Sequence, residues 1–453
     1  MSHHQSSTFI NEIIDSGSMS LQQFQVIGLC LFFNMLDGFD ITAMAVVANM
    51  VSSELVLTPD LLGWIFSFAL AGMMAGAMLL APVSDIIGRR KMIILSVALV
   101  GFSILLTANA STLTEFIALR FISGVGAGAM LASQAALAAE YSPEKYRALS
   151  VVVVTSGYPL GAMMTSVVAG LILPEYGWRG MFWFGGALTV SMVIVAWLFI
   201  PESLKYLVES RPKNALKRVN IIITRMKKST LDQLPEIFST EDKNSKTVLL
   251  QNMRKLLSDD NRVTTLTLWT AFFLCFSTLY FLMSWIPKLI EDSGYENVVG
   301  RQAFFLFNLG GVIGIYFTGW LSTRWKLTNI IFVLSILAAL GMVIFAMLPN
   351  NLSLLLSMIF LIGILQQGGF TGLYGAAAKA YPTEIRSTGI GWSIGLGRTG
   401  AVVGPAVAGY LIVAGFTMSA NFIFFSIPMA IGGIIAYRLH RSEERRVGKE
   451  CRS

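Results

Sequence analysis

Long runs of apolar residues dominate this sequence and constrain its fold more than any other feature. Of the 453 residues, 55% are hydrophobic and only 13% are charged, whereas about a quarter of the residues of a soluble protein are charged. A helix needs about 20 mostly apolar residues to cross the hydrocarbon core of a bilayer. A membrane β-barrel would instead show segments of about ten residues that alternate in polarity, and these runs do not alternate. The sequence therefore predicts an all-α integral membrane protein.

The apolar runs predict twelve transmembrane helices in two groups of six. The predicted spans are 23–48, 60–83, 92–110, 113–140, 148–173 and 178–200, followed by 263–287, 300–322, 328–347, 352–378, 387–414 and 418–438. We accordingly divide the chain into an N-terminal segment 1–22, a first bundle 23–200, a linker 201–262, a second bundle 263–438 and a tail 439–453. We expect the linker to contain some amphipathic helix.

The distribution of basic residues predicts how the chain is oriented. If the N-terminus is cytoplasmic, the loops and tails on that side hold 28 of the 33 Lys and Arg residues. The other side holds only Arg179, Lys288 and Arg301, and the remaining two, Arg120 and Arg398, fall inside spans. The positive-inside rule therefore predicts that both termini are cytoplasmic. The same rule explains the net charge of +7, so no nucleic-acid partner is needed to account for it.

The two predicted bundles are related by an internal repeat. Shifting the sequence by 239 residues places Pro143 on Pro382 and Arg147 on Arg386, in the loops that follow the fourth and tenth spans. Several Gly and Ala residues of the flanking spans match at the same shift. Two six-helix halves in parallel orientation are typical of transporters, whose substrate site lies where the halves meet.

Cysteine and histidine are too few, and too scattered, for a disulfide framework, a metal site or histidine-based catalysis in the membrane. These residues are Cys30, Cys275, Cys451, His3, His4 and His440. We therefore expect no metal, no cofactor and no enzymatic activity. A polytopic membrane enzyme or a sensor stays a less favoured alternative, because neither a positioned nucleophile nor a signalling domain is visible.

A short charged loop follows the second predicted span. It contains Asp85, Gly88, Arg89 and Arg90 and resembles the D-x-x-G-R-[RK] loop of the major facilitator superfamily. Ala81 and Ile86 depart from the fuller motif of that family, which has a glycine and a basic residue there. The segment P-E-S-L-K-Y-L at 201–207 resembles another element of the superfamily. The resemblance implies a charge network that stabilises one conformation, and we expect Arg147 and Arg386 to take part in it.

A narrower resemblance covers the whole membrane region. Its most specific element is Asp37-Gly38-Phe39-Asp40 in the first span, supported by the segments 374–389 and 397–405. Together they resemble the aromatic acid:proton symporter family. This resemblance implies uptake of a small aromatic carboxylate, such as a hydroxybenzoate, together with protons. It also implies a multi-pass protein of the bacterial inner membrane that functions as a monomer.

Four charged residues lie deep inside predicted spans: Asp37, Asp40, Arg120 and Arg398. A charge at mid-membrane costs about 2.5–3.5 kcal/mol on insertion scales, so such residues face protein or a water-filled cavity. They could simply form two ion pairs that hold helices together. None of the four has a charged counterpart in the other half at the 239-residue shift, and we therefore favour a role in transport.

The chemistry of these residues suits a proton-coupled carrier of an anion. Asp37 and Asp40 are three residues apart on one helix face, and two close, desolvated carboxylates disfavour joint ionisation, so one can carry a proton. Arg398 or Arg120 can hold a carboxylate through a bidentate guanidinium. Further candidates for substrate contacts are the aromatic and amide residues Tyr158, Tyr280, Trp285, Asn308, Gln366, Gln367, Tyr374 and Trp392. A carrier of another organic anion, a sugar or a drug stays the alternative within transport.

Overall fold

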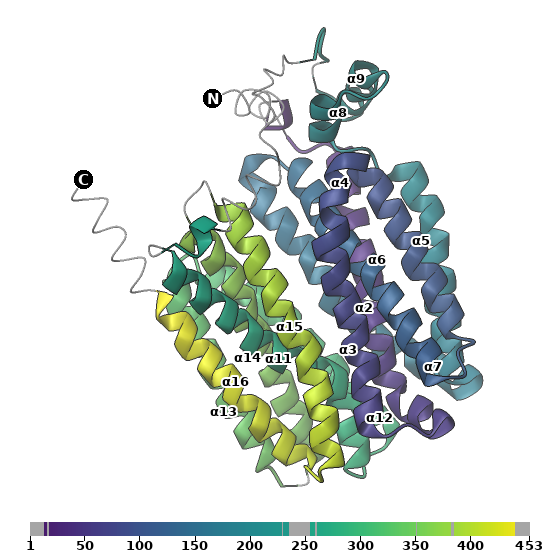
Figure 1. Cartoon of the computed structure of the whole chain (residues 1–453), viewed down its shortest axis with the longest axis vertical. Coiled ribbons are helices and arrows are strands. Elements are labelled where there is room, and N and C mark those ends of the chain that lie inside the picture. Colours follow the sequence, from purple (N-terminus) through teal and green to yellow (C-terminus); the bar gives the residue numbers. More distant parts are fainter. Residues whose placement is uncertain are drawn as a thin grey trace, which may run out of the picture.

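The structure is a computed structural model that describes residues 13–15, 18–228, 230–234, 254–258, 261–349, 351–381 and 385–439. All regular secondary structure in these residues is helical, which confirms the predicted all-α fold. The long helices form two bundles, one coloured purple to teal and one green to yellow (Figure 1).

The first bundle contains α2 (Leu21–Leu55), α3 (Pro59–Ala75), the π-helix η1 (Gly76–Leu80), α4 (Ala81–Ile87), α5 (Arg89–Thr107), α6 (Leu113–Glu140) and α7 (Glu144–Phe199). The short helices α8 (Leu204–Ser210) and α9 (Ala215–Arg225) follow it. The second bundle contains α11 (Arg262–Asp292), α12 (Asn297–Leu321), α13 (Leu327–Ala346), α14 (Leu352–Ala380), α15 (Arg386–Val413) and α16 (Met418–Tyr437).

Local sequence signals account for several of these boundaries. Ser20 and Gln23 form a capping box at the start of α2, and Thr112 and Glu115 form another at the start of α6. Each box satisfies backbone N–H groups that have no partner within the helix. The predicted span 60–83 is interrupted, because η1 separates α3 from α4. Pro82 lacks the N–H that would donate to the preceding turn, and the wider π-helical turn lies at that point.

α7 crosses the membrane twice. Eleven helices in the described part of the chain are long and apolar enough to span a bilayer, and α7 is one of them with 56 residues. That is far more than the roughly 20 residues one crossing needs. At Gly177 the backbone takes φ 59° and ψ −166°, which is not helical and which glycine tolerates because it has no Cβ. The predicted twelve crossings are thus confirmed, with the break between 173 and 178 where it was expected.

The repeat extends over both bundles. The 239-residue shift carries α2, α3, α5 and α6 onto α11, α12, α13 and α14 to within two residues at each helix start. Equivalent helices also pack in the same way, because α2 contacts α7 as α11 contacts α15, and α3 contacts α6 as α12 contacts α14. Gly161 and Gly400 are equivalent positions of the repeat. A Cβ at Gly161 would overlap the backbone carbonyl of Met35, and a Cβ at Gly400 would overlap that of Phe273. Small residues therefore allow the same close helix packing in both halves.

We call the end of the bundles that carries the loops 84–91, 141–147 and 322–326 the basic end, since these loops are rich in Lys and Arg. α8 and α9 extend from it (Figure 1). The side of the membrane that it faces stays a prediction, as do the cytoplasmic termini.

The two halves are joined by polar contacts at the opposite end. Asn49 of α2 donates to the Glu291 carboxylate of α11, and Lys288 Nζ donates to Asn49 Oδ1 at 2.5 Å. Asn49 and Lys288 are equivalent positions of the repeat and meet where the halves face one another. Trp64 Nε1 also donates to the Tyr410 hydroxyl at 3.0 Å. These contacts hold α2 and α3 against α11 and α15, so the halves are closed at this end.

Candidate functional site

Arg120 is engaged inside the first bundle. Its Nη1 lies 2.9 Å from Asp40 Oδ1, and the two side chains are 1% and 0% exposed. The same nitrogen donates to the backbone carbonyl of Asp40 at 3.2 Å, and the guanidinium lies over the Phe182 ring at 5.1 Å from its centroid. A buried pair of this kind is strongly destabilised when one partner is removed. Asp40 and Arg120 therefore connect α2 to α6.

Asp37 has a different environment from Asp40. It is fully buried, and neither of its carboxylate oxygens has a hydrogen-bond partner among the described residues. The charges that act on it come from Asp40 in the same helix and from Arg398 of α15 in the other half. A buried carboxylate without a direct partner is costly, so Asp37 is available to bind a proton or a cationic group.

Arg398 of α15 is a buried cation without an ion-pair partner among the described residues. It is 7% exposed, no carboxylate among the residues that the structure describes lies within ion-pair distance, and its Nε has no hydrogen-bond partner there. Its guanidinium carbon lies 6.0 Å from the centroid of the Phe276 ring, a distance at which a cation–π attraction is still felt. Arg398 is thus placed to hold an anion that the protein itself does not supply.

Phe276, the ring next to Arg398, belongs to a group of aromatic rings in the second bundle. Phe272, Phe276 and Tyr280 follow one another on α11 at intervals of four residues, so they lie on one helix face. Phe370 and Tyr374 of α14 pack against them, with ring centroids 4.6 Å apart for Phe276 and Phe370 and 5.3 Å apart for Phe272 and Tyr374. We call these five residues the aromatic wall. The edge-to-face geometry suits a further planar ring beside them.

Tyrosine hydroxyl groups extend this site to the first bundle. Tyr158 of α7 is partly buried and lies close to Tyr280, and its hydroxyl has no partner with hydrogen-bonding geometry in the described residues. The charges of Asp37 and Arg398 act on both Tyr158 and Tyr280, and that of Arg398 also acts on Tyr374. Asp37, Tyr158, Arg398 and the aromatic wall therefore form one cluster between the halves, which we call the central cluster.

The other predicted substrate residues with amide side chains have different surroundings. Gln366 lies on the α14 face that carries Phe370 and Tyr374, at four-residue intervals. Gln367 packs instead against Gly311 of α12. Asn308 Nδ2 donates to the Phe304 carbonyl within α12 at 2.9 Å.

Two tryptophans from the same prediction pack in the apolar core. Trp392 is partly buried in the apolar core. Trp285 is fully buried, and its Nε1 donates to the Pro405 carbonyl at 3.1 Å. Sequence reasoning missed Phe272, Phe276 and Phe370, although aromatic residues at four-residue spacing were a usable signal.

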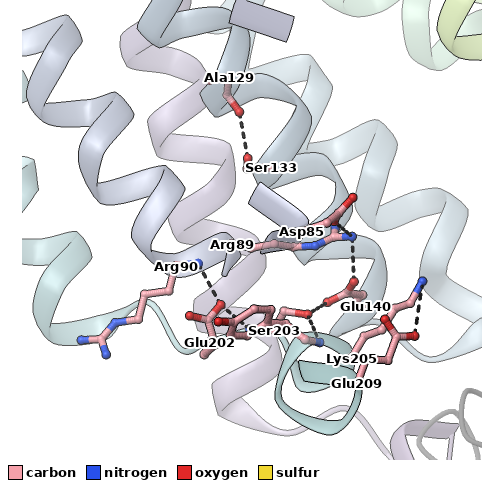
Figure 2. A network of polar contacts seen from close by, with 11 residues as sticks. Asp85, Arg89, Arg90, Ala129, Ser133, Glu140, Glu202, Ser203, Lys205 and Glu209 are labelled. Atoms are coloured by element: carbon pink, nitrogen blue, oxygen red, sulfur yellow. Dashed lines mark hydrogen bonds and ion pairs between the residues drawn. The ribbon is translucent and has the colours of Figure 1, made fainter. Parts of the chain in front are cut away.

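The charged loop at the basic end forms a network within the first half (Figure 2). Arg89 lies 3.0 Å from Glu140 at the end of α6 and 3.5 Å from Asp85. The Ser203 hydroxyl donates to Glu140 at 2.5 Å. The network therefore holds the start of α5 against the end of α6 and against the segment after α7.

A second set of contacts centres on Glu202. Its carboxylate accepts from the backbone N–H of Arg90 at 3.0 Å, and the Tyr141 hydroxyl donates to its backbone carbonyl at 2.7 Å. Gly88 has φ 100°, where only glycine is unstrained, and a Cβ there would collide with the Glu202 carboxylate. The sequence predicted Asp85, Gly88, Arg89 and Arg90 as members of this network but assigned no role in it to Glu140 or Glu202.

Two further residues were expected in the network. Arg147 is in the first turns of α7, and no contact joins it to the network residues in the described part. Arg386 begins α15, and its side chain lies outside the described part of the structure. Their participation stays a prediction.

We expect Glu140→Gln to destabilise the protein more than Asp85→Asn, although both remove a carboxylate beside Arg89. The Glu140 side chain is 17% exposed and that of Asp85 is 70% exposed. An exposed ion pair contributes about 0–1 kcal/mol, whereas a buried charged group that loses its partner costs about 1–3 kcal/mol or more. Thermal unfolding of the detergent-solubilised variants measures the difference. Equal losses of stability would show that Glu140 is not the main partner of Arg89.

Comparison with known proteins agrees with this architecture. The family model of the Major Facilitator Superfamily matches residues 27–364 and 303–451. The D-xylose-proton symporter has a similar fold, with a TM-score of 0.71 at 14% identity over 91% of this chain and 97% of that one.

Curated relatives of similar length also match. The chain is 30% identical to the benzoate transport protein of Acinetobacter baylyi, over 95% of this chain and 92% of the relative. It is 29% identical to the 4-hydroxybenzoate transporter of the same organism, over 94% of this chain and 93% of the relative. The gallate transporter of Pseudomonas putida is 27% identical over 92% of both chains. The chain therefore belongs to the Major Facilitator Superfamily, in the same family as the benzoate transport protein, and is a membrane transporter and not an enzyme.

Proposed function

We propose that the protein imports a small aromatic carboxylate together with protons, by alternating access of the central cluster to the two sides of the membrane. The observation that supports this most is Arg398, a buried cation without an ion-pair partner in the described residues, between Asp37 and the aromatic wall. A guanidinium binds a carboxylate bidentately, and the wall offers a surface for a ring. The names of the benzoate, 4-hydroxybenzoate and gallate transporters point to the same substrate class.

In this proposal Asp37 binds the transported proton. Unlike Asp40, whose charge is matched by Arg120, Asp37 has no cation in direct contact. Arg398 acts on it from the other half, and a substrate carboxylate at Arg398 would offset that positive charge. The proton affinity of Asp37 would then depend on whether substrate is bound, which is the condition for coupled transport.

The central cluster also argues against a neutral sugar as substrate. A sugar is recognised through hydroxyl groups and does not need an unmatched guanidinium in the membrane, which is costly to bury. The similarity to the xylose symporter is at 14% identity and concerns the fold alone.

We further propose that the protein resides in a bacterial inner membrane as a monomer, with both termini and the basic end in the cytoplasm. The excess of Lys and Arg at the basic end supports this orientation. The bacterial sources of the curated relatives support the location. In this orientation the contacts of Asn49, Lys288 and Glu291 close the outer side.

The test is to measure equilibrium binding of an aromatic acid and of its neutral amide to wild type and Arg398→Lys. Lysine keeps the charge but loses the bidentate geometry. We expect wild type to prefer the acid, and the variant to lose about 1.5–3 kcal/mol of acid binding, roughly ten- to hundredfold. Arg179→Lys is the matched control, because Arg179 is exposed and pairs with Glu54 at the opposite end. An unchanged acid-over-amide ratio in Arg398→Lys would refute the proposed substrate anchor.

A further inference from the structure

Gln366 is a buried amide whose side-chain hydrogen-bonding groups are unused. The residue is fully buried in α14, and neither its Nε2 nor its Oε1 has a partner among the described residues. Burying an amide whose N–H and C=O groups both lack partners costs about as much free energy as losing one hydrogen bond at each of these groups. A leucine or methionine of similar size would avoid this cost, so packing alone does not account for a glutamine at this position.

The position of Gln366 connects it to the central cluster. Gln366, Phe370 and Tyr374 follow one another at four-residue intervals, so they form one stripe along α14. Phe370 and Tyr374 of this stripe belong to the aromatic wall and pack against its α11 residues. Arg398 lies beside Phe276 of the same wall. An aromatic acid that binds Arg398 through its carboxylate and packs its ring on the aromatic wall would therefore contact the face of α14 that also carries Gln366.

An amide in such a place can recognise a hydroxyl group. Its Oε1 accepts from a phenolic O–H and its Nε2 donates to the phenolic oxygen. A ring without a substituent offers neither bond and leaves both groups of the amide unpaired. Sites built to bind a substrate hydroxyl discriminate strongly against the analogue that lacks it, for this reason.

We propose that Gln366 determines specificity for the ring, so that the protein prefers aromatic carboxylates that carry a ring hydroxyl over unsubstituted ones. The inference rests on the proposed function, because it assumes that an aromatic acid binds with its carboxylate at Arg398. It goes further by assigning the opposite part of the substrate to a particular residue. Gln367, the next residue, is not part of this assignment, because it packs against Gly311.

The experiment compares benzoate with its hydroxylated derivatives in wild type and Gln366→Leu. Equilibrium binding to the purified protein and competition with uptake in proteoliposomes are both measured. We expect wild type to bind at least one hydroxybenzoate isomer roughly ten- to hundredfold more tightly than benzoate. Gln366→Leu should lose that preference while its affinity for benzoate is unchanged or higher. The loss of preference would be confined to the isomers that wild type favours.

The matched control is Gln134→Leu. Gln134 of α6 is also fully buried, and both of its amide groups lack partners in the described part of the chain. The substitution is therefore the same in chemistry and burial but lies outside the aromatic wall, so it should leave the hydroxybenzoate-to-benzoate ratio unchanged. Gln366→Glu, which keeps an acceptor, serves if the leucine variant fails to fold, and it should change the order of preference among the isomers.

The outcomes separate the two proposals. If no aromatic acid binds to wild type, the proposed function fails. If benzoate and the hydroxybenzoates bind wild type equally, or if Gln366→Leu keeps the wild-type ratio, the proposed function stands and the role of Gln366 is refuted. An equal change of the ratio in the Gln134 control would also refute it, because a general effect on packing would then explain the result.

Discussion

Asp37→Asn is expected to abolish proton-driven accumulation of the substrate while leaving substrate exchange intact. Asparagine has nearly the shape of a protonated aspartate but cannot release a proton. Because Asp37 is fully buried and no cation contacts it directly, the substitution removes a costly buried charge, and we expect the variant to insert and fold. We expect accumulation to be lost completely, because the central cluster, among the described residues, contains no other acidic residue that could bind the proton in place of Asp37.

Two assays on the same proteoliposomes test this expectation. The first measures uptake driven by an imposed proton gradient, and the second measures exchange of labelled for unlabelled substrate without a gradient. Asp60→Asn is a suitable control, because Asp60 lies in the first turn of α3 at the opposite end, away from the central cluster. Full accumulation in Asp37→Asn would exclude Asp37 from the proton pathway, and loss of both activities would indicate a structural role instead.

The sequence predicted the fold well because its signals are local or periodic. Each span is a continuous apolar run, so its length follows from the thickness of the bilayer. The break in α7 lies at Gly177, where the apolar pattern was already interrupted between 173 and 178. The 239-residue repeat was visible in a few residues near Pro143 and Pro382. In the structure the same shift places the first residues of α2, α3, α5 and α6 within two residues of those of α11, α12, α13 and α14.

The pairing of the intramembrane charges could not be predicted in the same way. Asp37 and Asp40 were treated as equivalent, because residues three apart share a helix face. Three residues nevertheless correspond to about 300° of rotation, so the two side chains diverge by about 60° around α2. Asp40 thereby contacts Arg120 within its own half, whereas Asp37 is influenced by Arg398 from the other half. The rotation of α2 in the bundle decides this, and it depends on packing between helices far apart in the sequence.

Two acidic residues at the basic end, Glu140 and Glu202, were missed for a related reason. Asp85, Arg89 and Arg90 were recognised from a motif, but Glu140, which pairs with Arg89, and Glu202, which accepts from the backbone N–H of Arg90, come from other segments. Glu202 follows the last turn of α7, and only the folding of α7 into two crossings brings it beside Gly88. The motif predicts that a charge network exists. The identity of the acids depends on which helix ends meet at this surface.

Breaking the buried pair of Asp40 and Arg120 should have the largest effect on stability. Arg120→Met leaves Asp40 without its cation in a site where both side chains are at most 1% exposed. Removing one partner of a buried pair typically costs about 3–5 kcal/mol. Replacing both partners by apolar residues is often neutral, since neither charge is then buried without the other. We therefore expect the double variant Asp40→Leu/Arg120→Met to recover most of the stability that the single variant loses.

Thermal unfolding and gel filtration of the purified variants measure the stability, and transport assays on the double variant show whether the pair does more than hold α2 against α6. Because Asp37 and Arg398 are unchanged in it, we expect the double variant to bind the aromatic acid and to accumulate it with the proton gradient. A double variant no more stable than Arg120→Met would contradict the ion pair as the cause. A stable double variant that binds and exchanges substrate but does not accumulate it would place Asp40 in the proton pathway beside Asp37.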